Sequence, residues 1–160
     1  MGIKEDIKTS KFSCIQEETM INIIYTCSWL NSFQSRFKKF GISSQQYNVL
    51  RILRGSHPQF LRLADITERM IDKMSNATRL VEKLRQKGLV NREICPDNRR
   101  QVNISITPSG MDLLTQIENH PEANLCFMNA LSIEELQTLS TLLDKLRKTK
   151  SRTLYIQQLL

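Results

Sequence analysis

A short stretch near the middle of the chain brings together side chains that are suited to reading nucleic acid. Asn76 and Arg79 carry the amide and guanidinium groups that can make paired hydrogen bonds with adenine and guanine. Ser75 and Thr78 add hydroxyl groups, and Lys83, one helical turn beyond Arg79, is spaced for a phosphate contact. These five residues are therefore candidate DNA-binding residues.

Two of these candidates also have a purely structural interpretation. Ser75 can act only as a helix cap, and Arg79 can form an ion pair within the protein, with Glu82 or Glu68. The sequence leaves both alternatives open.

The pattern predicts a helix over residues 74–87 that presents these side chains. Ser75 or Asn76 can accept a hydrogen bond from a free backbone N–H of its first turn. Lys87-Gly88 closes it with a cation and a glycine that can adopt the left-handed conformation. The apolar residues of one face follow at helical spacing: Ala77, Leu80, Val81 and Leu84.

A two-stranded hairpin is predicted directly after this helix, over residues 89–107. Apolar and polar residues alternate on both sides of a turn at Pro96-Asp97-Asn98, for example at Val102, Ile104 and Ile106. A short helix followed by a hairpin is typical of a winged helix-turn-helix. In such a fold the helix enters the major groove of DNA, and the wing reaches the neighbouring backbone or minor groove.

Asn98, Arg99 and Arg100 lie at the predicted tip of the hairpin. The two arginines have no apolar role there, so all three residues are candidates for contact with the minor groove or the backbone. The alternative is a tip that is merely solvated.

Three further helices are predicted before residue 71. The first is long and amphipathic and spans Glu17–Phe40, whereas residues 1–12 are expected to be loosely ordered. Ser43 or Ser44 caps the second, which stops before His57-Pro58. The third covers residues 61–70 and is followed by a turn at residues 71–73.

Two helices are predicted after the hairpin. Thr107-Pro108 combines a cap with a proline at the first helical position, and His120-Pro121 breaks that helix. Ser132 with Glu135 three residues later forms a capping box for the last helix.

The end helices carry more apolar surface than one small winged lobe can cover, which predicts a homodimer built from both chain ends. The alternative is that these helices fold back onto their own domain. The candidate dimerisation residues recur at the spacing of helix pairs: Ile23, Leu30, Leu136, Leu139, Leu143 and Leu146.

Positive charge concentrates in the segment whose pattern suits DNA. Residues 36–100 hold 15 Lys and Arg against 6 Asp and Glu, a net charge of +9, whereas the remaining residues hold 8 against 10, a net charge of −2. The total of +7 therefore originates in the middle of the chain, which favours a polyanionic partner.

No catalytic, metal or cofactor site is predicted. Four cysteines are scattered without a C-x-x-C pair, and Cys27 and Cys126 are expected to act as small apolar residues. The sequence contains neither a glycine-rich phosphate loop nor a nucleophile elbow, the motifs that would indicate an enzyme. Without an apolar span or secretory signal, a cytoplasmic location is expected.

Several short sequence motifs, taken together in their order and spacing, match a known protein family. They are Gly41-Ile42-Ser43 with Gln46-Tyr47, residues 75–84, Lys87-Gly88-Leu89-Val90, residues 97–100 with 106–110, and residues 131–136. In these the chain resembles the MarR family of bacterial transcription regulators, from about Glu17 to Lys148. The resemblance implies dimers that bind pseudo-palindromic operators and often respond to small ligands or oxidants.

The sequence departs from the family pattern at the wing and at Arg62. The family usually has Asp-x-Arg, which points to Arg100 when counted back from Thr107 and to Arg99 when counted forward from Asp97. Arg62 replaces a common capping Ser or Thr and is a candidate phosphate contact.

The predicted fold is therefore mainly α (α+β), a single MarR-like domain over 1–160. Residues 41–110 form the winged helix-turn-helix lobe, and residues 13–40 and 111–160 the dimerisation helices. The predicted function is a homodimeric, sequence-specific regulator, a repressor that a small-molecule effector releases from double-stranded DNA. The alternatives are a winged-helix protein-interaction module and a thiol-based redox sensor acting through Cys14 near the first helix.

Overall fold

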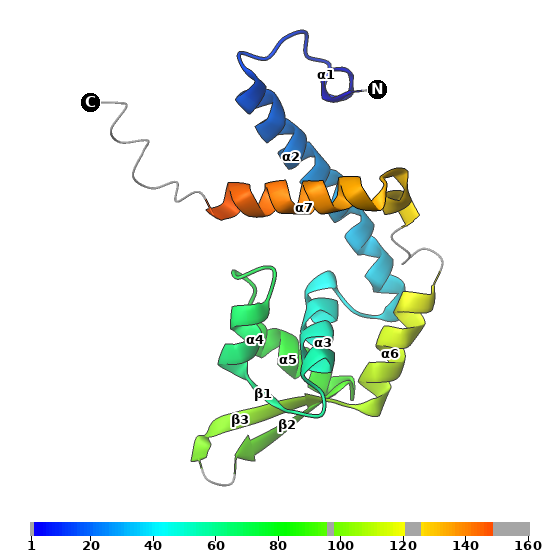
Figure 1. Ribbon diagram of the computed structural model, residues 1–160. Helices are drawn as coiled ribbons and strands as arrows, with labels where there is room; N and C mark the ends of the chain where they lie inside the picture. The colour runs from blue at the N-terminus through cyan, green and yellow to red at the C-terminus, as the bar shows by residue number, and fades with distance from the viewer. Residues whose placement is uncertain (1, 96–97, 121–125, 149–160) are drawn as a thin grey trace, which may run out of the picture. The chain divides into compact units, whose positions relative to one another are not determined.

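The computed structural model describes residues 2–95, 98–120 and 126–148 (Figure 1). The chain divides into two compact units, Met1–Ala123 and Asn124–Leu160. It is mostly helical with one three-stranded antiparallel sheet, which confirms the predicted mainly α, α+β class. None of the described helices is long and apolar enough to cross a membrane. The predicted turn at residues 96–97 and the end of the predicted dimerisation segment, residues 149–160, lie outside the described residues.

The first unit begins with α1 (Ile3–Asp6), so the expectation of loose order over residues 1–12 is wrong for this helical turn. Ile3 is buried, and Lys4 Nζ lies 3.7 Å from a carboxylate oxygen of Glu18 on the next helix. Burial of Ile3 and the ion pair of Lys4 help to hold this helical turn, and the local sequence pattern does not reveal either contact.

The predicted helix Glu17–Phe40 is two elements, α2 (Ile15–Ser32) and the 3₁₀ helix η1 (Phe33–Phe40). A 3₁₀ helix repeats every three residues, and this winding brings Phe37 and Phe40 to one side. Phe37 is buried with its ring stacked 4.4 Å from that of Tyr47, and Phe40 packs against the same core. Packing of these two rings accounts for the change from the α-helical repeat.

The helix α3 (Ser44–Ser56) starts at a reciprocal cap. The backbone N–H of Gln46 donates to Ser43 Oγ at 3.2 Å, and the N–H of Ser43 donates to Gln46 Oε1 at 2.9 Å. Of the two predicted caps, Ser43 is therefore the one used.

A short strand, β1 (Leu61–Arg62), precedes α4 (Leu63–Arg69), so the prediction of a helix from residue 61 is wrong by two residues. Leu61 and Arg62 pair with Ile104 and Asn103, more than forty residues away. The helical spacing of the local apolar residues cannot reveal a ladder whose partner lies so far along the chain.

The predicted hairpin is confirmed. β2 (Val90–Cys95) and β3 (Asn98–Ile106) pair antiparallel from Val90↔Ile106 to Ile94↔Val102, and the strand order is β1-β3-β2 (Figure 1). Asn98, predicted in the turn, belongs to the backbone of β3 and pairs with Cys95.

The predicted start of α6 (Pro108–Asn119) is also confirmed. Thr107 Oγ1 accepts the N–H of Gly110 at 3.1 Å and donates its own proton to the carbonyl of Gly88 at 2.8 Å. One side chain therefore caps α6 and ties it to the residue that precedes the hairpin.

The core of the first unit gathers around α3, which contacts α4, α5 (Ala77–Gln86), α6 and β3. Side chains with almost no exposed surface come from these elements, from the residue after α4 and from the first residue of β2: Val49, Leu50, Leu53, Ile66, Met70, Val81, Leu84, Val90, Ile104, Leu114 and Ile117.

An ion pair joins α3 to α6. Arg54 donates two hydrogen bonds to the carboxylate of Glu118 at 2.9 and 2.5 Å, and Arg51 lies 3.6 Å from it. The hydrogen bonds from Arg54, more than the Coulombic attraction, lower the pKa of Glu118, and the same pair raises the pKa of Arg54.

The second unit contains the 3₁₀ helix η3 (Cys126–Ala130) and α7 (Ile133–Lys148). The predicted capping box is confirmed, because the N–H of Glu135 donates to Ser132 Oγ at 3.2 Å and the N–H of Ser132 donates to Glu135 Oε2 at 2.8 Å.

Replacement of Gly110 is expected to disrupt the contact between α6 and the hairpin. A Cβ at this position would lie 2.4 Å from the carbonyl oxygen of Leu89 and 2.7 Å from Ile106 Cγ1. Gly110→Ala should therefore lower the free energy of unfolding by about 1–3 kcal/mol, measured by urea denaturation.

Gly55→Ala is the matched control, since Gly55 lies in α3 and a methyl group added there would meet nothing within 4 Å. This substitution should raise the free energy of unfolding by about 0.5–1 kcal/mol. Equal effects of the two substitutions would contradict the close contact at Gly110.

The ion pair of Glu118 should give an acid-sensitive part of the stability. Folding lowers the pKa of Glu118. The stabilising contribution of the ion pair is therefore complete at pH values above the unfolded-state pKa near 4.5, and it is lost as the pH falls through the folded-state pKa. Both partners are partly exposed, so we expect Glu118→Gln to lower the free energy of unfolding at pH 7 by about 0.5–1 kcal/mol. In urea denaturation the difference from the parent should shrink at pH 3, and a difference independent of pH would refute this assignment.

Candidate nucleic-acid interface

The candidate recognition helix α5 begins at Ala77, so the predicted start at residue 74 is wrong by three residues and the predicted end at residue 87 by one. Asn76 has an extended backbone, and its Oδ1 accepts the N–H of Arg79 at 3.0 Å. Asn76 is therefore the cap, and the interpretation of Ser75 as the cap is wrong.

The loop before α5, residues 71–75, is held together by Asp72. Its Oδ1 accepts the N–H of Met74 at 3.0 Å, and its Oδ2 accepts the hydroxyl proton of Ser75 at 2.6 Å. The bond from Ser75, followed by that from Met74, lowers the pKa of Asp72, so this carboxylate stays ionised at neutral pH. The closed loop engages the hydroxyl of Ser75 and leaves Asn76 as the cap, so α5 starts at Ala77.

Sequence reasoning gave Asp72 no role beyond its place in the turn. The sequence nevertheless contains the pattern of an Asx turn at this point. Asp72 is followed by a backbone N–H two residues later and by a hydroxyl donor three residues later. Asp72 is thus a positioning residue for the start of α5.

The helix α5 has a buried and an exposed face. Its buried residues face the core: Ala77, Val81 and Leu84. The predicted DNA-binding residues at its start and along it are exposed: Asn76, Thr78, Arg79 and Lys83. Because buried and exposed residues alternate with the helical repeat, packing fixes which side chains point outward.

Arg79 makes no ion pair with either glutamate that the sequence offered as a partner. The carboxylate of Glu82 instead accepts hydrogen bonds from Arg85 at 2.8–3.2 Å, which lowers the pKa of Glu82. Within the described part of the chain, the guanidinium of Arg79 therefore stays available to an external partner.

The wing places the backbone of Asn98, Arg99 and Arg100 at the beginning of β3. Their side chains lie outside what the structure describes, so neither arginine is assigned to a groove by geometry. The choice between Arg99 and Arg100 stays a prediction.

Arg62 lies on β1 and is exposed, and its N–H donates to Asp65 Oδ2 at 3.0 Å. The guanidinium of Arg62 has no acceptor and cannot cap α4, so the carboxylate of Asp65 forms this bond at the start of the helix.

Arg62 also lines a cavity of about 340 Å³ together with Thr78 of α5 and Arg92 of β2. This cavity brings two arginines and a candidate residue of α5 together, and Arg92 was not among the predicted residues.

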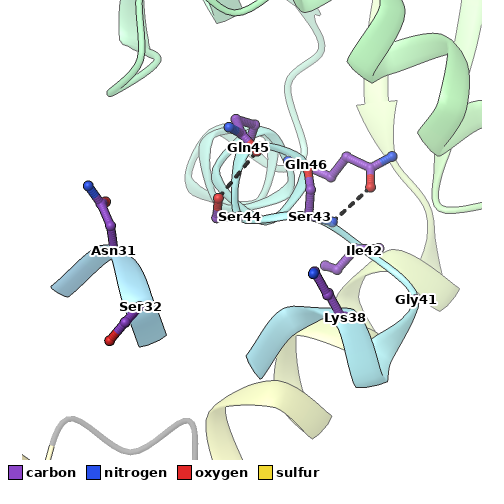
Figure 2. A pocket seen from close by; sticks show the side chains of 9 residues that line it. All are labelled: Asn31, Ser32, Lys38, Gly41, Ile42, Ser43, Ser44, Gln45 and Gln46. Carbon is purple, nitrogen blue, oxygen red and sulfur yellow. Dashed lines mark hydrogen bonds between the residues drawn. The ribbon is translucent and has the colours of Figure 1, made fainter. Parts of the chain in front are cut away.

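A larger open pocket of about 630 Å³ lies where α2 and η1 approach the start of α3. Figure 2 shows Asn31 and Ser32 on one wall and Lys38 near the start of α3. Lys38 is the charged residue among those that line it: Asn31, Ser32, Lys38, Gly41, Ile42, Ser43, Ser44, Gln45 and Gln46.

The predicted dimerisation residues are distributed over α2 and α7. Ile23 and Leu30 on α2 are half-buried, as are Leu136 and Leu143 on α7. Leu139 and Leu146 are exposed. Both helices also expose other large apolar side chains: Ile15, Met20, Ile24, Tyr25 and Trp29 on α2, and Ile133 and Leu142 on α7.

Among the cysteines whose side chains the structure describes, Cys14 at the cap of α2 and Cys27 within that helix are free and exposed. Cys27 was expected to act as a small apolar residue, but it is exposed in the single chain, where no residue of α2 is buried. The side chain of Cys126 lies outside the description.

Comparisons with known proteins agree with this geometry. A model of the MarR family matches residues 42–102. The HTH-type transcriptional regulator PecS of Dickeya dadantii is 28% identical over 114 residues, which cover 70% of this chain and 69% of PecS. This relative and a putative regulatory protein for the hcr operon of Thauera aromatica are both named as transcriptional regulators, not as enzymes.

Two solved structures are similar over most of the chain. A MarR transcription factor from Planctomyces limnophilus is 30% identical, with a TM-score of 0.63, covering 84% of this chain and 98% of that one. MepR of S. aureus, solved as a complex with DNA, is 21% identical with a TM-score of 0.68, covering 87% and 99%. The likeness to MepR concerns the fold.

The cap of α5 yields a test of the role of Asn76 in folding. Asn76→Ala removes the acceptor for the N–H of Arg79 and should lower the free energy of unfolding by about 1 kcal/mol, whereas Asn76→Asp keeps the acceptor and should preserve stability. Urea denaturation of both variants checks this, and an Asn76→Ala protein as stable as the parent would contradict the cap.

Proposed function

This chain belongs to the MarR family of transcriptional regulators, and we propose that it acts as a homodimer that binds pseudo-palindromic operator DNA in a sequence-specific manner. The observation that carries the proposal is the outward face at the start of α5. There Asn76, Thr78, Arg79 and Lys83 are exposed on a helix whose opposite face is fixed in the core. The surrounding segment, residues 36–100, carries a net charge of +9.

The residues of α5 receive different roles in this proposal. The guanidinium of Arg79 can bond to both O6 and N7 of guanine, and Lys83 is assigned to phosphate. Asn76 Oδ1 already accepts a backbone N–H, so the amide nitrogen with its two N–H donors is the group left to bond to a base acceptor. Thr78 offers its hydroxyl to phosphate or base. Ser75 stays at the interface with its proton directed to Asp72.

The wing is proposed to follow the backbone and enter the minor groove. Asn98 and either Arg99 or Arg100 would make this contact, because arginine favours the negative potential of a narrow minor groove. Arg62 would contact a phosphate from the exposed position where β1 meets α4.

We assign dimerisation to the apolar residues of α2 and α7. Large apolar side chains exposed on both helices support this assignment, because a single chain in water would leave them uncovered. The proposed contacts comprise Ile23, Leu30, Leu136, Leu139, Leu143 and Leu146. Two such subunits would place two α5 helices on half-sites about one helical turn (~34 Å) apart.

We further propose that the protein represses transcription, and that a small-molecule effector bound in the pocket of Figure 2 relieves this repression. The pocket is built from the end of α2, from η1 and from the capped start of α3. An occupant would touch α3, and α3 in turn packs against α5. The pocket is therefore placed to influence the orientation of the recognition helix.

The proposal predicts DNA binding that weakens steeply with salt. The logarithm of the binding constant should fall with the logarithm of salt concentration by about 0.9 per phosphate contacted. Lys83→Ala should reduce this slope by about 1 per subunit, and Arg79→Ala should weaken specific binding by about 1–3 kcal/mol and relax base preference. Fluorescence anisotropy with labelled duplexes from the region upstream of the gene measures both.

Arg147→Ala is the matched control, since this arginine lies on α7 and is paired with Asp144 of the same helix. It should leave both the slope and the affinity unchanged. If Arg99→Ala and Arg100→Ala both bind as tightly as the parent, the proposed role of the wing is wrong. Absence of binding to any duplex at low salt would instead favour a protein-interaction module.

A further inference from the structure

The loop between α4 and α5 reverses the usual distribution of polar and apolar side chains. Ile71 and Met74 are 87% and 94% exposed. Most large apolar residues of the first unit are packed, and an exposed thioether beside a helix start gains nothing from folding. Folding therefore leaves the thioether of Met74 accessible to a partner.

The polar side chains of the same loop turn back onto the protein. Both carboxylate oxygens of Asp72 accept bonds from within the loop, one of them from the hydroxyl of Ser75. The ammonium of Lys73 donates to the carbonyls of Glu68 and Thr67 near the end of α4. These bonds fix the loop, so Met74 is displayed on an ordered backbone and not on a loose connection.

Met74 lies two residues before the cap of α5, and therefore beside the part of the helix that carries Asn76 and Arg79. In the major groove the apolar group that distinguishes one base from the others is the 5-methyl group of thymine. A methionine side chain is flexible and polarisable and can adapt to such a group without leaving a polar atom unpaired.

We propose that Met74 contacts the 5-methyl group of a thymine in each half-site and thereby adds thymine specificity to the interface. This inference rests on the proposed function. Asp72 is the positioning residue, because its bonds to Met74 and Ser75 order the loop before DNA arrives and so reduce the entropy lost on binding. The neighbouring exposed cation of Arg79 favours DNA over an apolar protein surface as the partner.

The test compares one duplex with and without the methyl groups. A duplex is first selected from a random-sequence library by the parent protein, and is then synthesised with deoxyuridine in place of every thymidine. The parent should bind the deoxyuridine duplex about fourfold more weakly for each methyl group contacted, at the same salt concentration. Single replacements should confine this loss to one position in each half-site.

Met74→Ala should bind the two duplexes equally, whereas Met74→Leu should keep the discrimination. Ile71→Ala is the matched control, because it removes a comparable apolar side chain from the same loop and should still discriminate. Circular dichroism of each variant verifies that the fold is retained.

Equal binding of the two duplexes by the parent overturns the inference, as does discrimination that survives Met74→Ala. Loss of discrimination in Ile71→Ala but not in Met74→Ala would overturn the assignment to Met74. Failure of the parent to select or bind any duplex is a different result, since it refutes the proposed function itself.

Discussion

Burial of one face of α5 is the constraint that the interface depends on. Val81 and Leu84 have almost no exposed surface, and Ala77 at the start of the helix is also buried. Each fully buried side chain of this kind contributes about 1.5–3 kcal/mol, so the helix cannot rotate about its axis without a large loss of stability. With the rotation fixed, the helical repeat directs Arg79 and Lys83 outward. The core thus determines which side chains a partner meets.

The hairpin is positioned relative to α5 by a second set of bonds. Thr107 donates to the carbonyl of Gly88 and caps α6, so the end of α5, the hairpin and α6 meet at one point. Gly110 allows the close approach, because a side chain there would collide with the carbonyl of Leu89. On the other side of the lobe, β1 pairs with β3 and links the start of α4 to the same hairpin. The helix α5 and the hairpin are therefore held by one connected structure within the first unit.

The sequence predicted correctly those elements that depend on residues close together in the chain. Thr107-Pro108 and the pair Ser132 and Glu135 mark helix starts because a cap is formed by neighbours in the chain. The hairpin followed from alternation over a few residues. By contrast, Leu61 and Arg62 pair with residues far along the chain, and the change of winding at Phe33 reflects packing of aromatic rings against α3. Such features depend on partners that periodicity does not identify.

The start of α5 was the least predictable part of the candidate site because several polar residues there compete for the same backbone donors. Ser75 and Asn76 are both good caps, and the choice between them is made by Asp72, which engages the hydroxyl of Ser75 and leaves Asn76 to accept the N–H of Arg79. In the proposed function, base recognition would compete with capping for the same oxygen of Asn76. The exposed side chains of Arg79 and Met74 take no part in holding the helix start, so they meet no such conflict. Folding thus divides the helix start into side chains that hold it in place and side chains that remain free to recognise a ligand, a division that residue types alone do not reveal.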